Sequence, residues 1–106
     1  SSELLKLTFP HPRMPLLFAL GLYAFRAEQY EVAGDFFLRV KEVATSGVDG
    51  IHNLYRIMGI SFILANVPDP GLPALQRALE ACKPQDDGCR EVGLKGLSWA
   101  EVRPRD

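Results

Sequence analysis

Apolar residues in this chain recur every three or four positions, and no stretch shows the sustained apolar–polar alternation of a half-buried strand. The helical spacing extends over four segments, at residues 16–27, 30–44, 51–66 and 70–82. Glycine and proline separate these segments, as in the run Val67-Pro68-Asp69-Pro70-Gly71 and at Pro84. The pattern therefore predicts an all-α protein of successive helices joined by short turns.

The first and third predicted helices are apolar on two sides, whereas the second is charged on one face. In the first, Leu16 and Leu20 share one stripe, and Phe18 and Phe25 share another. A helix that is apolar on two sides is expected to be buried on both. We therefore expect the first and third helices to be inner helices and the second to lie in an outer layer.

A fifth, short helix is expected before Trp99, although Gly93 and Gly96 weaken its helical propensity. Trp99 is then expected to cover the end of the core. Near the other end of the chain, three prolines separate the first residues from the helical pattern. We expect three parts: an N-terminal segment at 1–13, a helical domain at 14–98 and a solvated tail at 99–106.

Size and charge limit the functions that this chain can have. Its 106 residues suffice for one domain with a modest core. The net charge is -1 and the two signs are interspersed, which gives no electrostatic footprint for nucleic acid or an anionic membrane. The longest uncharged apolar run, residues 14–25, is shorter than the ~20 residues that span a bilayer. Neither nucleic-acid binding nor membrane insertion is expected.

The first residues contain no basic stretch followed by a cleavage site, so no export signal is expected in them. A cytoplasmic location is favoured, although a mature exported chain would look the same.

Residue types that often perform chemistry are scattered along the chain. His11 and His52 are isolated, and the residue one turn after His52 is Arg56, so no metal site is expected. Cys82 lies beside Lys83 but has no histidine nearby to act as its base. No glycine-rich loop follows a strand, as a phosphate cradle requires. We therefore expect no cofactor and no enzymatic activity.

The two cysteines, Cys82 and Cys89, lie on either side of a turn at residues 83–88. If this turn joins two antiparallel helices, the cysteines can approach the distance that a disulfide requires. Two reduced, half-buried thiols are the simpler interpretation, and a disulfide is the alternative.

A pair formed by an apolar residue and a glycine occurs three times, as Leu20-Gly21, Met58-Gly59 and Val92-Gly93, and the glycines lie 38 and 34 residues apart. The first two pairs have neighbours of similar type at identical offsets: Leu17, Ala24, Ala33, Phe37 and Val40 in the first unit, and Tyr55, Phe62, Gly71, Leu75 and Ala78 in the second. This pattern resembles the tetratricopeptide repeat. The inner helix of that repeat has a large residue, a Leu-Gly pair and an aromatic residue, and its outer helix has a small residue followed by two apolar ones. Pro84 lies near the position of the repeat's closing proline.

The resemblance implies about two antiparallel helix-turn-helix units and a short C-terminal capping helix that contains Gly93. It also implies that inner and outer helices cross closely, with Gly21 against Ala33 and Gly59 against Gly71, because larger side chains would push them apart. The chain departs from the family in lacking aromatic residues at positions 17 and 24, and in a turn between units that is four residues longer. A generic antiparallel bundle with glycine crossings is the alternative.

In tetratricopeptide repeats, the inner helices line a concave groove that binds segments of partner proteins. The resemblance places eight residues in this groove: Phe18, Leu22, Phe25, Arg26, Asn53, Arg56, Ile60 and Ile63. Phe18 and Leu22 occupy the positions where a carboxylate-binding subgroup has a lysine and an asparagine, so that clamp is not expected. An apolar or amphipathic segment suits such a groove better. Alternatively, residues 4–9 of the same chain fill it.

These observations predict a protein-interaction module, either an adaptor or a chaperone-like domain, that binds a segment of another protein or a peptide. The alternative is a structural subunit that assembles into a homo- or hetero-oligomer, because each of so few repeats buries little surface alone.

Overall fold

The computed structural model describes residues 14–44 and 50–103. They form five helices: α1 (Met14–Arg26), α2 (Tyr30–Val43), α3 (Ile51–Leu64), α4 (Pro68–Glu80) and α5 (Asp87–Val102). None of the described residues belongs to a strand, so the predicted all-α fold is confirmed. The N-terminal segment expected at residues 1–13, and with it the idea that residues 4–9 fill a groove, lies outside the described residues.

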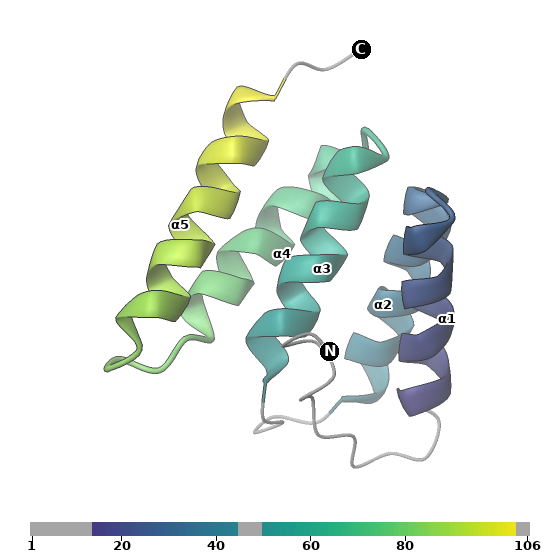
Figure 1. Cartoon of the computed structure of the whole chain (residues 1–106), viewed down its shortest axis with the longest axis horizontal. Helices are drawn as coiled ribbons and strands as arrows, with labels where there is room; N and C mark the ends of the chain where they lie inside the picture. Colours follow the sequence, from purple (N-terminus) through teal and green to yellow (C-terminus); the bar gives the residue numbers. More distant parts are fainter. Residues whose placement is uncertain (1–13, 45–49, 104–106) are drawn as a thin grey trace.

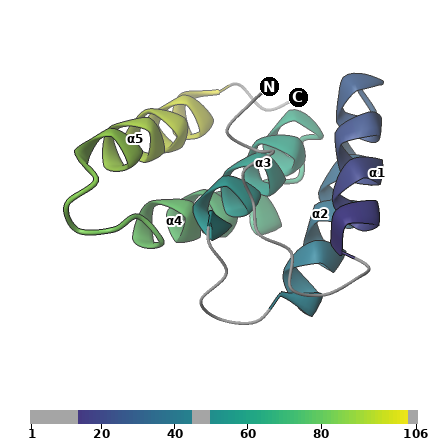
Figure 2. The same ribbon diagram turned by 60° about the horizontal axis from the view of Figure 1, so that its bottom comes forward.

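The helices form two layers. In Figure 1, α1, α3 and α5 lie in front, and α2 and α4 lie behind them. The main packing partners are consecutive along the chain, α1 with α2, α2 with α3, α3 with α4 and α4 with α5, and α5 also contacts α3. Figure 2 shows the same order from another side. This arrangement agrees with a repeat-like fold in which every second helix lies in the same layer.

Two clusters of buried side chains hold the layers together. The larger one lies mainly among α1, α2 and α3 and includes Phe37 and Leu54, which are almost completely buried. The smaller one joins α3, α4 and α5 through Ile63, Leu75 and Ala100. Because the second cluster is small, α5 is attached to the molecule through much less core than α1 or α2.

Glycines occur where the two layers approach closely. A Cβ atom on Gly59 would lie 2.7 Å from Cγ of Leu75 and 3.0 Å from the carbonyl oxygen of Gly71. This is the close approach of α3 and α4 that the repeat pattern implied. At Gly21, in contrast, the nearest atoms belong to the ring of Phe37 rather than to Ala33. The space beside Gly21 is thus filled by an aromatic ring from α2.

Two further glycines complete the packing. A Cβ atom on Gly93 would lie 3.0 Å from Cδ1 of Leu79, so Gly93 lies where α5 crosses α4. Gly34, which the repeat pattern does not single out, lies against the ring of Phe62 on α3. Each of the four consecutive helix pairs therefore has a glycine at its contact.

The expectation that α1 is buried on two sides is wrong. One face of α1 is buried through Met14, Phe18, Gly21 and Ala24. The opposite face leaves Leu16 63%, Leu20 40% and Tyr23 76% exposed. This face is exposed because α1 lies at the end of the row of helices and no described helix covers its outer side.

The fifth helix is longer than the sequence indicated. It continues to Val102, so Trp99 belongs to the helix and not to a tail. Two glycines in the interior of α5, Gly93 and Gly96, cost about 1 kcal/mol each in helical propensity. Favourable contacts offset this cost: Asp86 caps the helix by accepting a hydrogen bond from the Cys89 amide at 3.0 Å, and Gly93 allows α5 to pack closely on Leu79.

A disulfide joins Cys82 to Cys89, and their Cα atoms are 5.8 Å apart. The simpler interpretation, two reduced thiols, is therefore not the state of this structure. The turn between α4 and α5 reverses the chain and brings the end of one helix next to the first turn of the other (Figure 2). The disulfide ties α5 to α4 at this turn.

Candidate functional site: a groove between α3 and α5

The eight residues expected to line a groove do not share one surface. Phe18, Asn53 and Ile63 are at most 5% exposed, so these three side chains are buried and do not lie on an open surface. The ring of Phe18 packs against that of Phe37 with 5.5 Å between centroids, and Ile63 packs against Gly71. Phe18 belongs to the larger core cluster and Ile63 to the smaller one, and the repeat pattern does not fix the helix rotation that places them there.

Three residues from α1, Leu22, Phe25 and Arg26, do not line the groove between α3 and α5. Leu22 and Phe25 are half-buried and pack against the larger core cluster. Phe25 also meets the ring of Tyr30 edge-on at 5.3 Å. Arg26, at the end of α1, is exposed.

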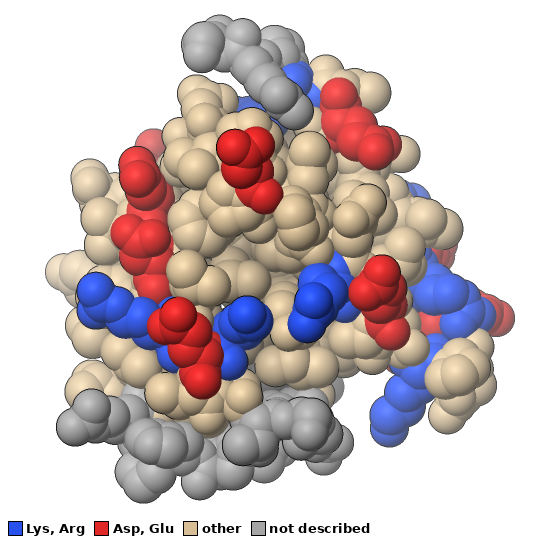
Figure 3. Space-filling model, turned by 180° about the vertical axis from the view of Figure 1, so that it is seen from behind, with Lys and Arg blue, Asp and Glu red and all other residues tan. Residues whose placement is uncertain are grey.

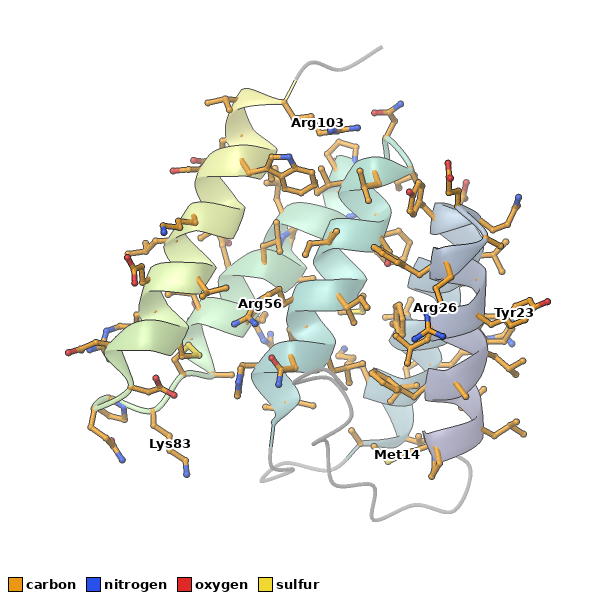
Figure 4. All side chains as sticks on the ribbon, in the orientation of Figure 1. Met14, Tyr23, Arg26, Arg56, Lys83 and Arg103 are labelled. Atoms are coloured by element: carbon orange, nitrogen blue, oxygen red, sulfur yellow. A yellow bond between two sulfur atoms is a disulfide. The ribbon has the colours of Figure 1, made fainter. Side chains whose placement is uncertain are left out.

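The last two of the eight residues, Arg56 and Ile60, do line a groove. It lies between α3 and α5 and has a volume of about 320 Å³. Figure 4 shows Arg56 on the side of α3 that faces α5. From α5, four residues complete the lining: Val92, Lys95, Gly96 and Trp99.

The walls of this α3–α5 groove are mostly apolar. Ile60 and Trp99 form part of the boundary of the smaller core cluster, and Val92 is 46% exposed. A Cβ atom on Gly96 would meet nothing within 4 Å, so the absence of a side chain there leaves open space. The guanidinium of Arg103 lies 5.4 Å from the centre of the Trp99 ring and restricts its orientation. The groove therefore offers an aromatic wall that is already in place.

Two cations stand beside this apolar surface, Arg56 on α3 and Lys95 on α5. Nη1 of Arg56 donates a hydrogen bond to Oδ1 of Asn53 at 3.1 Å, whereas its Nε is buried and has no acceptor among the described residues. Desolvation by burial lowers the pKa of Arg56. Lys95 forms an ion pair with Glu91 at 3.7 Å, in which both side chains are exposed and which is worth only about 0–1 kcal/mol.

The sequence contains a signal for the α5 wall of the groove. Val92, Gly96 and Trp99 are spaced i, i+4 and i+7, which places them on one face of a helix. Gly93 and Gly96 predicted a short helix that ends before Trp99, so the sequence pattern did not assign these three residues to one helix face.

The surface away from the α3–α5 groove has a further hollow and mixed charge. A shallow hollow of about 600 Å³ at the turn between α1 and α2 has three acidic residues in its lining, Glu28, Glu31 and Asp35. Within residues 14–44 and 50–103, no group of three or more His, Cys, Asp or Glu side chains is arranged to hold a metal ion. Seen from behind, the face formed by α2 and α4 has acidic and basic residues side by side (Figure 3). No helix in the described part of the chain has the length and apolar character needed to cross a membrane.

The fold and the groove define an all-α domain with an open, mostly apolar groove between two helices of one layer. No protein-family model, curated protein or solved structure matches this chain. The α3–α5 groove is therefore the feature of this structure that bears on function.

Proposed function

We propose that this chain is a protein-interaction module that holds an apolar segment of a partner protein in the α3–α5 groove. The observation behind the proposal is the combination of apolar walls and open space above Gly96. A volume of about 320 Å³ is at the lower end of the ~300–1,000 Å³ typical of ligand pockets. It is large enough for one or two bulky side chains, and such buried anchors supply most of the binding energy of an interface.

We also propose that the helices are repeats of the tetratricopeptide type. The identical offsets around Gly21 and Gly59 support this, and so does the close approach of Gly59 and Gly71. In such repeats, α3 and α5 would be consecutive inner helices, and the groove between them would belong to the surface that repeat proteins use for binding.

The variant Gly96→Leu tests the proposed function. Because a side chain at position 96 enters open space, this variant should fold normally and fill the groove. Proteins captured by the tagged chain from its native source would be quantified by mass spectrometry. We expect Gly96→Leu to capture about tenfold less of a partner that the wild type captures. A tenfold loss corresponds to about 1.4 kcal/mol of binding free energy.

A matched pair on α5 provides the control. Val92 lines the groove and Leu94 does not, although they are 46% and 56% exposed respectively. Val92→Asp should lose the same partner, and Leu94→Asp should retain it. If Gly96→Leu and Val92→Asp capture as much of the partner as the wild type does, the proposed function is contradicted.

A second candidate function is self-association through the outer face of α1. This face combines the exposed side chains of Leu16, Leu20 and Tyr23, and α1 has no charged residue before Arg26. Exposed apolar patches of this kind often mark interfaces between proteins. If the chain assembles through this face, Tyr23→Asp should dissociate the oligomer, as measured by sedimentation velocity, and Val32→Asp on α2 should not. A wild-type chain that is monomeric at every concentration would exclude this candidate.

A further inference from the structure

We infer that the α3–α5 groove selects an amphipathic helix of a partner protein that places an Asp or Glu side chain beside its large apolar anchor. The inference rests on the proposed function and specifies the chemistry of the partner. The structural reason is that Arg56 and Lys95 stand on opposite walls, next to the apolar surface of Ile60, Val92 and Trp99.

Among the described residues, Arg56 has no partner of opposite charge. The neutral amide of Asn53 accepts from Nη1, while Nε is buried without an acceptor among the described residues. Because burial has already removed part of its hydration, as the lowered pKa indicates, the guanidinium gains more from an incoming carboxylate than a fully hydrated one would. A carboxylate also matches the planar arrangement of guanidinium donors.

The local charge balance favours an acidic partner. The lining of the groove includes two cationic residues and no Asp or Glu. The carboxylate of Glu91 is 3.7 Å from Lys95, but this pair is exposed and weak, so Lys95 can exchange it for a partner carboxylate. A basic segment would bring like charges together, which is unfavourable.

The shape of the site favours a helix. The groove lies between two helices, and a third helix can place its apolar stripe against both. On a helix, residues three or four positions apart are neighbours. An acidic residue at that distance from the apolar anchor would therefore reach Arg56 or Lys95 while the anchor contacts Trp99.

Selection from a library of random 16-residue peptides displayed on phage tests this inference. The full chain and three variants, Arg56→Met, Lys95→Met and Gly96→Leu, would be used as separate baits. On the wild type, we expect enrichment of peptides that combine a large apolar residue with Asp or Glu three or four positions away. Arg56→Met and Lys95→Met should each weaken the acidic preference and keep the apolar one, and Gly96→Leu should enrich neither.

One enriched peptide would then be synthesised together with its Glu→Gln or Asp→Asn counterpart. Trp99 is the only tryptophan in the chain, so its fluorescence reports binding in the groove. We expect the amide peptide to bind the wild type about tenfold more weakly than the acidic one, and this difference in affinity to be smaller for Arg56→Met.

The outcomes separate this inference from the proposed function. Methionine keeps the apolar part of the arginine side chain, and circular dichroism would check that Arg56→Met is folded. The side chain of Lys95 is exposed, so Lys95→Met provides the comparison if Arg56→Met does not fold. Apolar enrichment without acidic residues, or acidic enrichment that survives both substitutions, would overturn the inference and leave the proposed function standing. No enrichment on the wild type would contradict both.

Discussion

At the scale of single residues, glycines determine how closely the helices of this chain can approach. The sequence identified Gly59 and Gly71, because both occupy equivalent small-residue positions in a repeated pattern. It did not identify Gly34, whose neighbour Phe62 lies in the second of the two proposed units. Offsets within one unit describe contacts within that unit, and they contain no information about how consecutive units pack.

Substitution of two glycines by alanine should have opposite effects. In Gly59→Ala, the added Cβ meets Leu75 and the backbone of Gly71, so we expect a loss of about 1–3 kcal/mol in the free energy of unfolding. In Gly96→Ala, the Cβ meets nothing and the helix gains propensity, so we expect a gain of about 0.5–1 kcal/mol. Urea denaturation would measure both. Equal effects of the two substitutions would contradict the close approach of α3 and α4.

At the scale of elements, α1 shows why apolar periodicity alone does not determine which face is buried. Leu16 and Phe18 are both large and apolar, and the sequence placed both in buried stripes. The structure buries Phe18 and leaves Leu16 exposed, because within residues 14–44 and 50–103 α1 is covered by α2 and the larger core cluster. Which face of a helix is buried depends on the helices that pack against it, and the sequence of the helix itself does not identify those neighbours.

Truncation of these two side chains distinguishes the two faces. We expect Phe18→Ala to lower the free energy of unfolding by about 3–5 kcal/mol, because it leaves a cavity against Phe37. Leu16→Ala should change it by less than about 0.5 kcal/mol, because the side chain is exposed. Thermal or urea denaturation of the two variants would check this. A large loss for Leu16→Ala in the monomer would mean that another part of the chain covers this face.

Two features attach α5 to the rest of the molecule, the smaller core cluster and the Cys82–Cys89 disulfide. Reduction should lower the free energy of unfolding by about 2–3 kcal/mol through the loss of loop closure. Amide hydrogen exchange should then increase in α5 before it increases in α1 or α2. The variant with Cys82→Ser and Cys89→Ser should not respond to reductant. Uniform exchange in all five helices after reduction would argue against a weakly attached α5.

At the scale of the whole molecule, the sequence predicted the all-α class and the order of five helices, because helical periodicity and turn residues are local signals. It indicated only part of the proposed binding surface. Arg56 and Ile60 line the α3–α5 groove, and the other wall of this groove comes from α5 and not from α1. The site depends on the rotation of each helix and on the length of α5, which packing and the capping Asp86 determine.

A partner segment held in the α3–α5 groove should contact the residues of α3 and α5 that line it. The most direct test is to titrate the isotopically labelled chain with the captured partner segment and to map the changes in amide and indole chemical shifts. We predict that the largest changes occur at residues that line the groove, including Ile60, Gly96 and the indole of Trp99. Changes concentrated on the outer face of α1, or on α2 and α4, with the groove residues unaffected, would contradict this claim.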